Sequence, residues 1–262
     1  MVAVNETSVM GKWGREVEFG EIQALETPKK LGNRHYPINF DSQVEVIDRS
    51  IRTWDWRAIN WKYYLDNEDQ KMLCTWTMSH PNVEYRKNHT IAGFGVFSTN
   101  QKVATIVGTG DRCWLCSNGM YTADHIYRRK STENALEDIR NNLWDMMGDL
   151  VTVSKKITDD WSRWDNHDLS SKTEVSDLLI EAADRNVINW RDIPHVRQHW
   201  LEPEHQEFKG RNLANFVQAF TSHQRTKSPF SMTSFSTNLH RFINDRVYGG
   251  DEVEVLNSGR DE

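Results

Sequence analysis

The chain has 262 residues, a formal net charge of −6, three cysteines and eleven tryptophans. The negative charge argues against a protein that binds polyanions by bulk charge, and three sparse cysteines are not a disulfide framework. The sequence shows neither a signal peptide nor a run of 18 apolar residues, so we expect a cytoplasmic protein that does not enter a membrane.

The N-terminal 40 residues contain one expected strand, near 16–25, and are otherwise irregular. Ser42 and Glu45 fit a capping box, in which each side chain bonds a backbone N–H at the start of a helix. Apolar residues follow at helical spacing, so we predict a helix over 42–53.

The middle of the chain predicts an antiparallel meander of about five strands. Aromatic and β-branched residues fill short segments that polar or glycine-containing turns separate. Such short connections join antiparallel neighbours. The expected strands are 56–65, 71–78, 91–99, 102–107 and 112–116, the last of which stops at the turn Asn118-Gly119.

From Thr132 the apolar residues follow one another in steps of three and four, which is the spacing of a heptad seam. A core helix in a bundle shows the same spacing, so we expect this helix to pack within the chain. Packing against a helix of another chain is the alternative. The seam residues are Leu136, Ile139, Leu143, Met146, Leu150, Val153 and Ile157.

The rest of the C-terminal half is also expected to be helical. Ser171 and Glu174 form a second capping box that opens a helix. The later helices are expected over 189–200, 211–225 and 232–247.

These patterns predict a single α+β domain over residues 1–250, in which a β-meander packs on helices. The strand-rich part covers 55–117 and the helical part covers 131–247. The segment 251–262 contains five acidic residues and one arginine, and it is expected to be a flexible acidic tail.

Cysteine and histidine spacing invites a zinc interpretation, because Cys113 and Cys116 are three apart and His195 and His199 are four apart. The cysteines fall in a predicted strand, however, where residues three apart point to opposite faces. We therefore expect no metal or other cofactor and no catalytic residues. The pairs Gly93/Gly95 and Gly108/Gly110 lack phosphate-loop spacing and are expected to mark bulges or close packing.

Basic residues concentrate between positions 84 and 130, where seven Lys and Arg stand against three acids. Such residues neutralise phosphates, and exposed rings beside them stack bases for about 1–3 kcal/mol per base. A basic loop ahead of a helix N-terminus would also suit a bound anion. The alternative is that these charges are simply solvated. The candidate nucleic-acid-binding residues are Tyr85, Arg86, Lys87, Lys102, Tyr127, Arg128, Arg129 and Lys130.

Four segments resemble a family of uncharacterised phage- and plasmid-encoded proteins. They are Gly32-Asn-Arg-His-Tyr-Pro-Ile-Asn39, Cys116-Ser-Asn-Gly-Met120, Arg129-Lys-Ser-Thr-Glu-Asn134 and Asn212-Leu-Ala-Asn-Phe-Val-Gln-Ala-Phe-Thr221. The usual member has His-Thr-x-Asn where this chain has Lys130-Ser-Thr-Glu-Asn134, so no role of that histidine is carried over. The resemblance implies a gene of mobile elements near recombination and replication functions. It also implies a distant likeness to single-strand annealing proteins, which pair a β-meander with helices.

We therefore expect a phage-type protein of the host cytoplasm that binds single-stranded DNA, with strand annealing and recombination as the activity to test, and that is not an enzyme. The first alternative is an effector that binds and inhibits a host defence or replication enzyme. A metal-dependent enzyme is the third. Replication or recombination proteins are the expected partners of the acidic tail, and the sequence leaves a homo-oligomer open.

Overall fold

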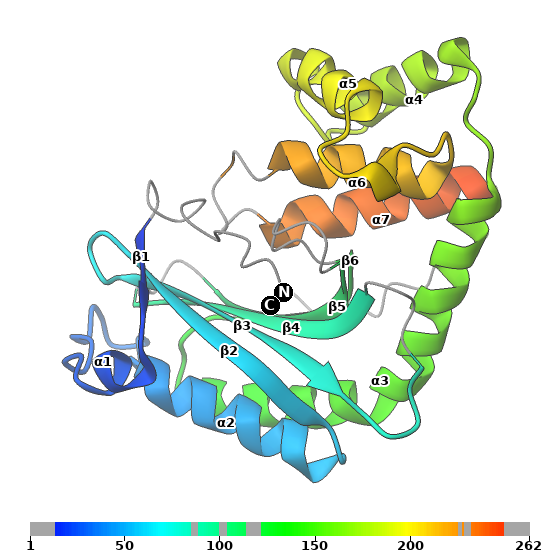
Figure 1. Ribbon diagram of the computed structural model, residues 1–262. Coiled ribbons are helices and arrows are strands. Elements are labelled where there is room, and N and C mark those ends of the chain that lie inside the picture. The colour runs from blue at the N-terminus through cyan, green and yellow to red at the C-terminus, as the bar shows by residue number, and fades with distance from the viewer. Residues whose placement is uncertain are drawn as a thin grey trace.

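The structure, a computed structural model, describes residues 14–84, 89–99, 104–113, 122–224, 227 and 232–248. These residues form one antiparallel sheet and a largely C-terminal set of helices, so the predicted α+β class is confirmed (Figure 1). The strands are β1 (Gly14–Val17), β2 (Arg57–Asp66), β3 (Lys71–Ser79), β4 (His89–Ser98), β5 (Thr105–Cys113) and β6 (Thr122–Arg129). The α-helices are α1 (Phe19–Gln23), α2 (Phe40–Thr53), α3 (Ala135–Asn166), α4 (Lys172–Asp184), α5 (Ile193–Leu201), α6 (Leu213–Gln224) and α7 (Met232–Tyr248).

The sheet follows the chain order β1-β2-β3-β4-β5-β6, and each strand is antiparallel to its neighbour. The predicted meander is therefore confirmed, with six strands where about five were expected. Helices α2 and α3 lie along one face of the sheet, and α3 continues upward to the group α4 to α7 (Figure 1).

Strands β5 and β6 differ from the prediction. β5 runs without a break over Thr105–Cys113, where two strands, 102–107 and 112–116, were expected. A register shift lies between Thr109 and Gly110 in the pairing with β6, where the pair Gly108/Gly110 was expected to mark a bulge or close packing. β6 lies where the sequence predicts a basic loop, because its charged residues hide the alternation of a strand; such side chains are common on edge strands.

Near the N-terminus the predicted strand over 16–25 is only partly correct. β1 ends at Val17, and the segment after it forms the short helix α1. Helix α2 begins at Phe40 with Asn39 as its N-cap residue, so the predicted capping box at Ser42 and Glu45 lies inside the helix and does not open it.

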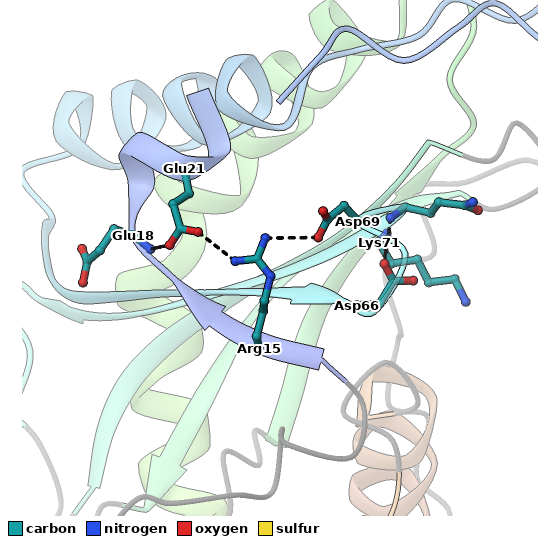
Figure 2. A network of polar contacts seen from close by, with 7 residues as sticks. Arg15, Glu18, Glu21, Asp66, Asp69 and Lys71 are labelled. Atoms are coloured by element: carbon teal, nitrogen blue, oxygen red, sulfur yellow. Dashed lines mark hydrogen bonds and ion pairs between the residues drawn. The ribbon is translucent and has the colours of Figure 1, made fainter. Parts of the chain in front are cut away.

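An ion-pair network fastens the edge strand β1 to the rest of the sheet (Figure 2). Arg15 on β1 donates to the carboxylate of Glu21 in α1 at 2.8 Å and to that of Asp69 at 3.4 Å. Asp69 lies in the predicted turn between β2 and β3, where the Asp66 carboxylate accepts the backbone N–H of Lys71 at 3.0 Å. Exposed ion pairs stabilise weakly, so this network mainly fixes position.

Two glycines in β4 give room to large core side chains. A Cβ added to Gly93 would lie 2.2 Å from the Trp76 ring, and one added to Gly95 would lie 2.4 Å from the Phe97 ring. Trp76 and Phe97 are completely buried between the sheet and its covering helices. The expectation of close packing at Gly93 and Gly95 is thus confirmed.

The heptad seam packs inside the chain, as predicted. α3 has 32 residues and contacts α2, β5, β6 and α6. Most of its seam is buried in the core: Ile139, Leu143, Met146, Leu150 and Ile157.

A buried polar cluster then joins the end of α3 to α7. The Asp160 carboxylate accepts a 3.2 Å hydrogen bond from the Asn244 amide and lies 3.3 Å from His240 Nε2. The Trp164 indole N–H donates to Asn244 Oδ1 at 3.1 Å. All four side chains are buried, so this cluster sets the register between the two helices.

The predicted C-terminal helices are present as α4 to α7. Ser171 caps α4 as expected, because its hydroxyl accepts the Glu174 backbone N–H at 3.3 Å. No helix within the described ranges has the length and apolar character needed to cross a membrane. The segment 251–262, predicted to be an acidic tail, lies outside the described residues.

Candidate functional site

The predicted basic segment lies where β6 passes into α3. Arg128 and Arg129 end β6 and Lys130 follows it, and all three side chains are exposed. The remaining basic or aromatic candidates, Tyr85, Arg86, Lys87 and Lys102, lie outside the described residues.

Tyr127 does not have the exposed ring that base stacking requires. Its side chain is 5 % exposed and belongs to the main core. Burial raises the pKa of its hydroxyl above the ordinary value. The expectation of an exposed ring is therefore wrong. The reason is the alternation of β6, which points Tyr127 toward α3.

The same alternation separates Arg128 from Arg129. Arg129 points to the side of Tyr127, and its guanidinium lies 2.7 Å from the Asp138 carboxylate of α3. Arg128 points to the other face, which Ile126 shares. One of the three predicted cations is thus held in an ion pair, and Arg128 and Lys130 have no ion pair within the described ranges.

A second basic segment lies beside the first. The Tyr36 backbone N–H donates a 3.1 Å hydrogen bond to the Ser131 carbonyl, which holds the loop between α1 and α2 against the connection from β6 to α3. Lys30 Nζ lies 4.6 Å from the centre of the Tyr36 ring. Both segments carry exposed cations, and we call the two segments together the basic junction: Lys29, Lys30 and Arg34 on the loop, and Arg128, Arg129 and Lys130 at the end of β6.

Acidic groups on the same segments offset part of this charge. Glu26 and Glu133 are exposed there, and Asp138 holds Arg129. The cations exceed these acids, so the basic junction carries a local positive charge in a chain whose net charge is −6. Sequence reasoning missed Lys29, Lys30 and Arg34, because nothing in the linear pattern places them beside residue 130.

Buried polar contacts fix the loop that carries this second segment. His35 is 1 % exposed, and its Nδ1 accepts the Leu31 backbone N–H at 3.0 Å. The buried Gln43 of α2 accepts the Thr105 hydroxyl at 3.0 Å through Oε1. Its amide N–H donates to the Ile38 carbonyl at 3.4 Å. Through Gln43 these contacts tie the loop to α2, which is itself bonded to β5, so the backbone that carries the second basic segment is fixed.

The sheet register decides whether the predicted clusters can meet. His89 at the start of β4 pairs with Cys113, whereas Arg129 at the end of β6 pairs with Thr105. These pairs mark opposite ends of the sheet, about 25 Å apart along the strands. The strand end that follows Tyr85, Arg86 and Lys87 in the sequence therefore lies far from Lys130.

The histidines considered for zinc belong to an internal charge cluster. His195 and His199 of α5 lie near His223 of α6, with ring centres 5.7 Å and 6.5 Å from that of His223. His223 Nε2 lies 3.4 Å from the buried Asp192 carboxylate. Lys227 Nζ lies 3.0 Å from the same oxygen.

Asp192 is therefore compensated within the protein. Burial disfavours its charge, but the hydrogen bonds from Lys227 and Asn189, together with the nearby charges of His223 and Lys227, lower the pKa of the carboxyl. In the described part of the chain, no group of three or more His, Cys, Asp or Glu side chains is arranged to hold a metal ion. Cys116 lies outside that part.

Comparisons of the chain with protein-family models, with curated proteins and with solved structures give no match. The likeness to phage and plasmid proteins therefore rests on the sequence segments alone. Two of those segments, 32–39 and 129–134, meet at the basic junction through the hydrogen bond between Tyr36 and Ser131.

Proposed function

We propose that the protein binds single-stranded DNA at the basic junction, as a phage- or plasmid-type protein of recombination or replication would. The observation that carries the proposal is the joining of two exposed cationic segments by the bond from Tyr36 to Ser131. Lysine and arginine side chains grouped in this way neutralise successive backbone phosphates and release counterions.

The surroundings of the basic junction favour a single strand over a duplex. Leu31 is 58 % exposed and lies between Lys30 and Arg34 in the sequence. The half-buried Tyr36 ring lies beside Lys30. An apolar surface next to cations suits unstacked bases, which only a single strand presents.

The test is the binding of a fluorescent single-stranded oligonucleotide of about 20 nucleotides, followed by anisotropy. Binding should weaken steeply between about 50 and 200 mM salt, because each phosphate contact releases counterions. The triple variant Lys29→Ala/Lys30→Ala/Arg34→Ala and the double variant Arg128→Ala/Lys130→Ala should each lower both the affinity and the salt slope. Each lost contact should reduce the slope by about 1.

A matched control is the variant Lys155→Ala/Lys156→Ala. These two lysines are exposed neighbours on α3, about 30 Å further along the helix than its start, and should leave binding unchanged. Absence of binding by the unaltered chain at low salt would refute the proposal. Mixing complementary oligonucleotides with the protein then tests for annealing.

A second candidate function is the protein-binding effector that inhibits a host enzyme. The observation in its favour is a pair of exposed rings, Trp54 and Trp144, whose centres are 5.4 Å apart. Exposed tryptophans are common at the centres of protein interfaces. Capture of one defined host protein after nuclease treatment, lost in Trp144→Ala, would support this function over the first.

A further inference from the structure

A second cluster of hydrogen-bond donors lies at the far end of the sheet from the basic junction. It surrounds a pocket of about 580 Å³ between the end of α2, the start of β2 and the end of β3. We call it the β2 pocket, and the lining residues that matter here are Arg52, Asp55, Trp56, Arg57, Ser79 and His80. Arg57 pairs with Ser79, at the end of the sheet where β4 begins.

The local backbone places these groups around the pocket. α2 ends at Thr53, and Asp55 adopts a left-handed conformation with φ of 60°, which turns the chain sharply into β2. Arg52 precedes this turn and Arg57 follows it, and both line the pocket with Trp56. Trp56 is 1 % exposed, and its ring centre lies 4.8 Å from that of His80.

The pocket has more donors than acceptors. The indole N–H of Trp56 is buried and has no hydrogen-bond partner within the described residues. An acceptor oxygen of a bound ligand would satisfy this donor. His80 Nδ1 accepts the Asn82 backbone N–H at 3.1 Å, so this nitrogen is not an acceptor for a ligand.

The arginines add cationic donors. Arg52 uses its Nε to contact the Asp48 carboxylate at 2.9 Å, while its two terminal nitrogens carry further N–H groups. Arg57 is exposed and makes no ion pair in the described part of the chain. Asp55 is the one carboxylate among the described lining residues. The balance of groups therefore favours an anion rich in acceptor oxygens.

We propose that the β2 pocket binds a phosphate group, carried either by a free nucleotide or by a nucleic-acid strand. Two guanidinium groups match phosphate oxygens, because each presents a planar fork of donors. A volume of about 580 Å³ holds a mononucleotide and falls in the usual range of ligand sites. This site is separate from the basic junction and does not depend on DNA binding there.

Titration calorimetry of the full chain with inorganic phosphate and with adenosine monophosphate tests the site. Arg57→Ala and Arg52→Ala should each weaken binding about tenfold, as expected for loss of a charge-assisted hydrogen bond. Arg49→Ala is the matched control, because Arg49 is on the same helix as Arg52 but does not line the pocket, and it should not change binding.

Two further variants guard against mere loss of folding. Asp55→Asn tolerates the left-handed conformation and removes the repelling charge, so it should tighten phosphate binding several-fold. Trp56→Phe keeps an aromatic ring but removes the indole N–H donor, so it should weaken phosphate binding. No binding of either probe at millimolar concentration, or an equal loss in Arg49→Ala and Arg57→Ala, would overturn the proposal.

The variant Lys29→Ala/Lys30→Ala/Arg34→Ala tests whether the phosphate belongs to a free nucleotide or to a nucleic-acid strand. Its basic junction is weakened, so strand binding there interferes less. If a short oligonucleotide displaces adenosine monophosphate from this variant at lower concentration than free nucleotide does, the strand is the source. If free nucleotide binds more tightly, the pocket is a nucleotide site. Both results support phosphate recognition, whereas unchanged phosphate binding in Arg52→Ala/Arg57→Ala would contradict it.

Discussion

The guanidinium of Arg129 lies 2.7 Å from the carboxylate of Asp138, so the last residue of β6 is bonded to the first turn of α3. Both side chains are partly exposed, at 42 % and 34 %. The pair therefore contributes little to stability but neutralises one cation of the basic junction.

This pair makes a prediction for nucleic-acid binding. Asp138→Asn removes the internal partner of Arg129 and frees one cation for phosphate, so affinity should rise and the salt slope should steepen by about 1. Anisotropy titrations over a range of salt concentrations measure both quantities. The unfolding free energy should change by no more than about 1 kcal/mol, as is usual for exposed ion pairs.

Asp149→Asn is the control for that experiment. Asp149 is an exposed acid further along α3, and its replacement changes the net charge by the same amount. If both variants raise affinity equally, overall charge and not the release of Arg129 controls binding.

Local pattern was enough to predict most of the fold. Aromatic and β-branched residues fill β2, β3 and β4 between turns, and the seam of α3 repeats without interruption, so each segment indicates its own structure. β6 was not predicted, because Arg128 and Arg129 at the end of this edge strand are charged and hide the pattern of a strand. Helix α1 was not predicted because it has only five residues.

The candidate site was harder to predict, because it depends on contacts between distant segments. Arg128 and Lys130 were found from their sequence, but Lys29, Lys30 and Arg34 join them only through the backbone bond from Tyr36 to Ser131. The β2 pocket depends on how the end of α2 turns at Asp55, and no spacing rule connects Arg52 with His80.

The buried cluster between α3 and α7 should be sensitive to the loss of one amide. Asn244→Leu leaves the Trp164 indole N–H without its acceptor and removes one donor from the Asp160 carboxylate. The expected loss in the free energy of unfolding is about 2–5 kcal/mol, since two buried hydrogen bonds are broken. Urea denaturation measures it.

Arg241→Ala serves as the comparison, because Arg241 is exposed on the same helix and should change stability by less than about 0.5 kcal/mol. Equal stability of Asn244→Leu and Arg241→Ala would show that the cluster does not hold the helices together.

Two glycine substitutions should change the free energy of unfolding in opposite directions. Gly93→Ala places a methyl group 2.2 Å from the buried Trp76 ring, which must shift, so unfolding should become easier by about 1–3 kcal/mol. Gly20→Ala meets no atom within 4 Å on helix α1 and should add about 0.5–1 kcal/mol, because alanine favours the helix. Thermal or urea unfolding of the two variants in parallel measures both changes. Unchanged stability of Gly93→Ala would mean that the Trp76 ring has room to move.

The His223 side chain should make stability depend on pH. Burial lowers the pKa of its imidazole from 6.5, and the opposing attraction of Asp192 does not restore it. Because the folded state resists the proton more than the unfolded state does, stability is full above about pH 6.5 and falls as the pH drops toward the lowered pKa. The lowered pKa of Asp192 acts in the same direction but only at more acidic pH, below the ordinary value of 3.8.

In His223→Gln the unfolding free energy, measured by urea denaturation from about pH 7 to pH 5, should therefore fall less than in the unaltered protein. Identical pH profiles for the two proteins would contradict this, because the same proton-linked loss would then have to come from groups other than His223.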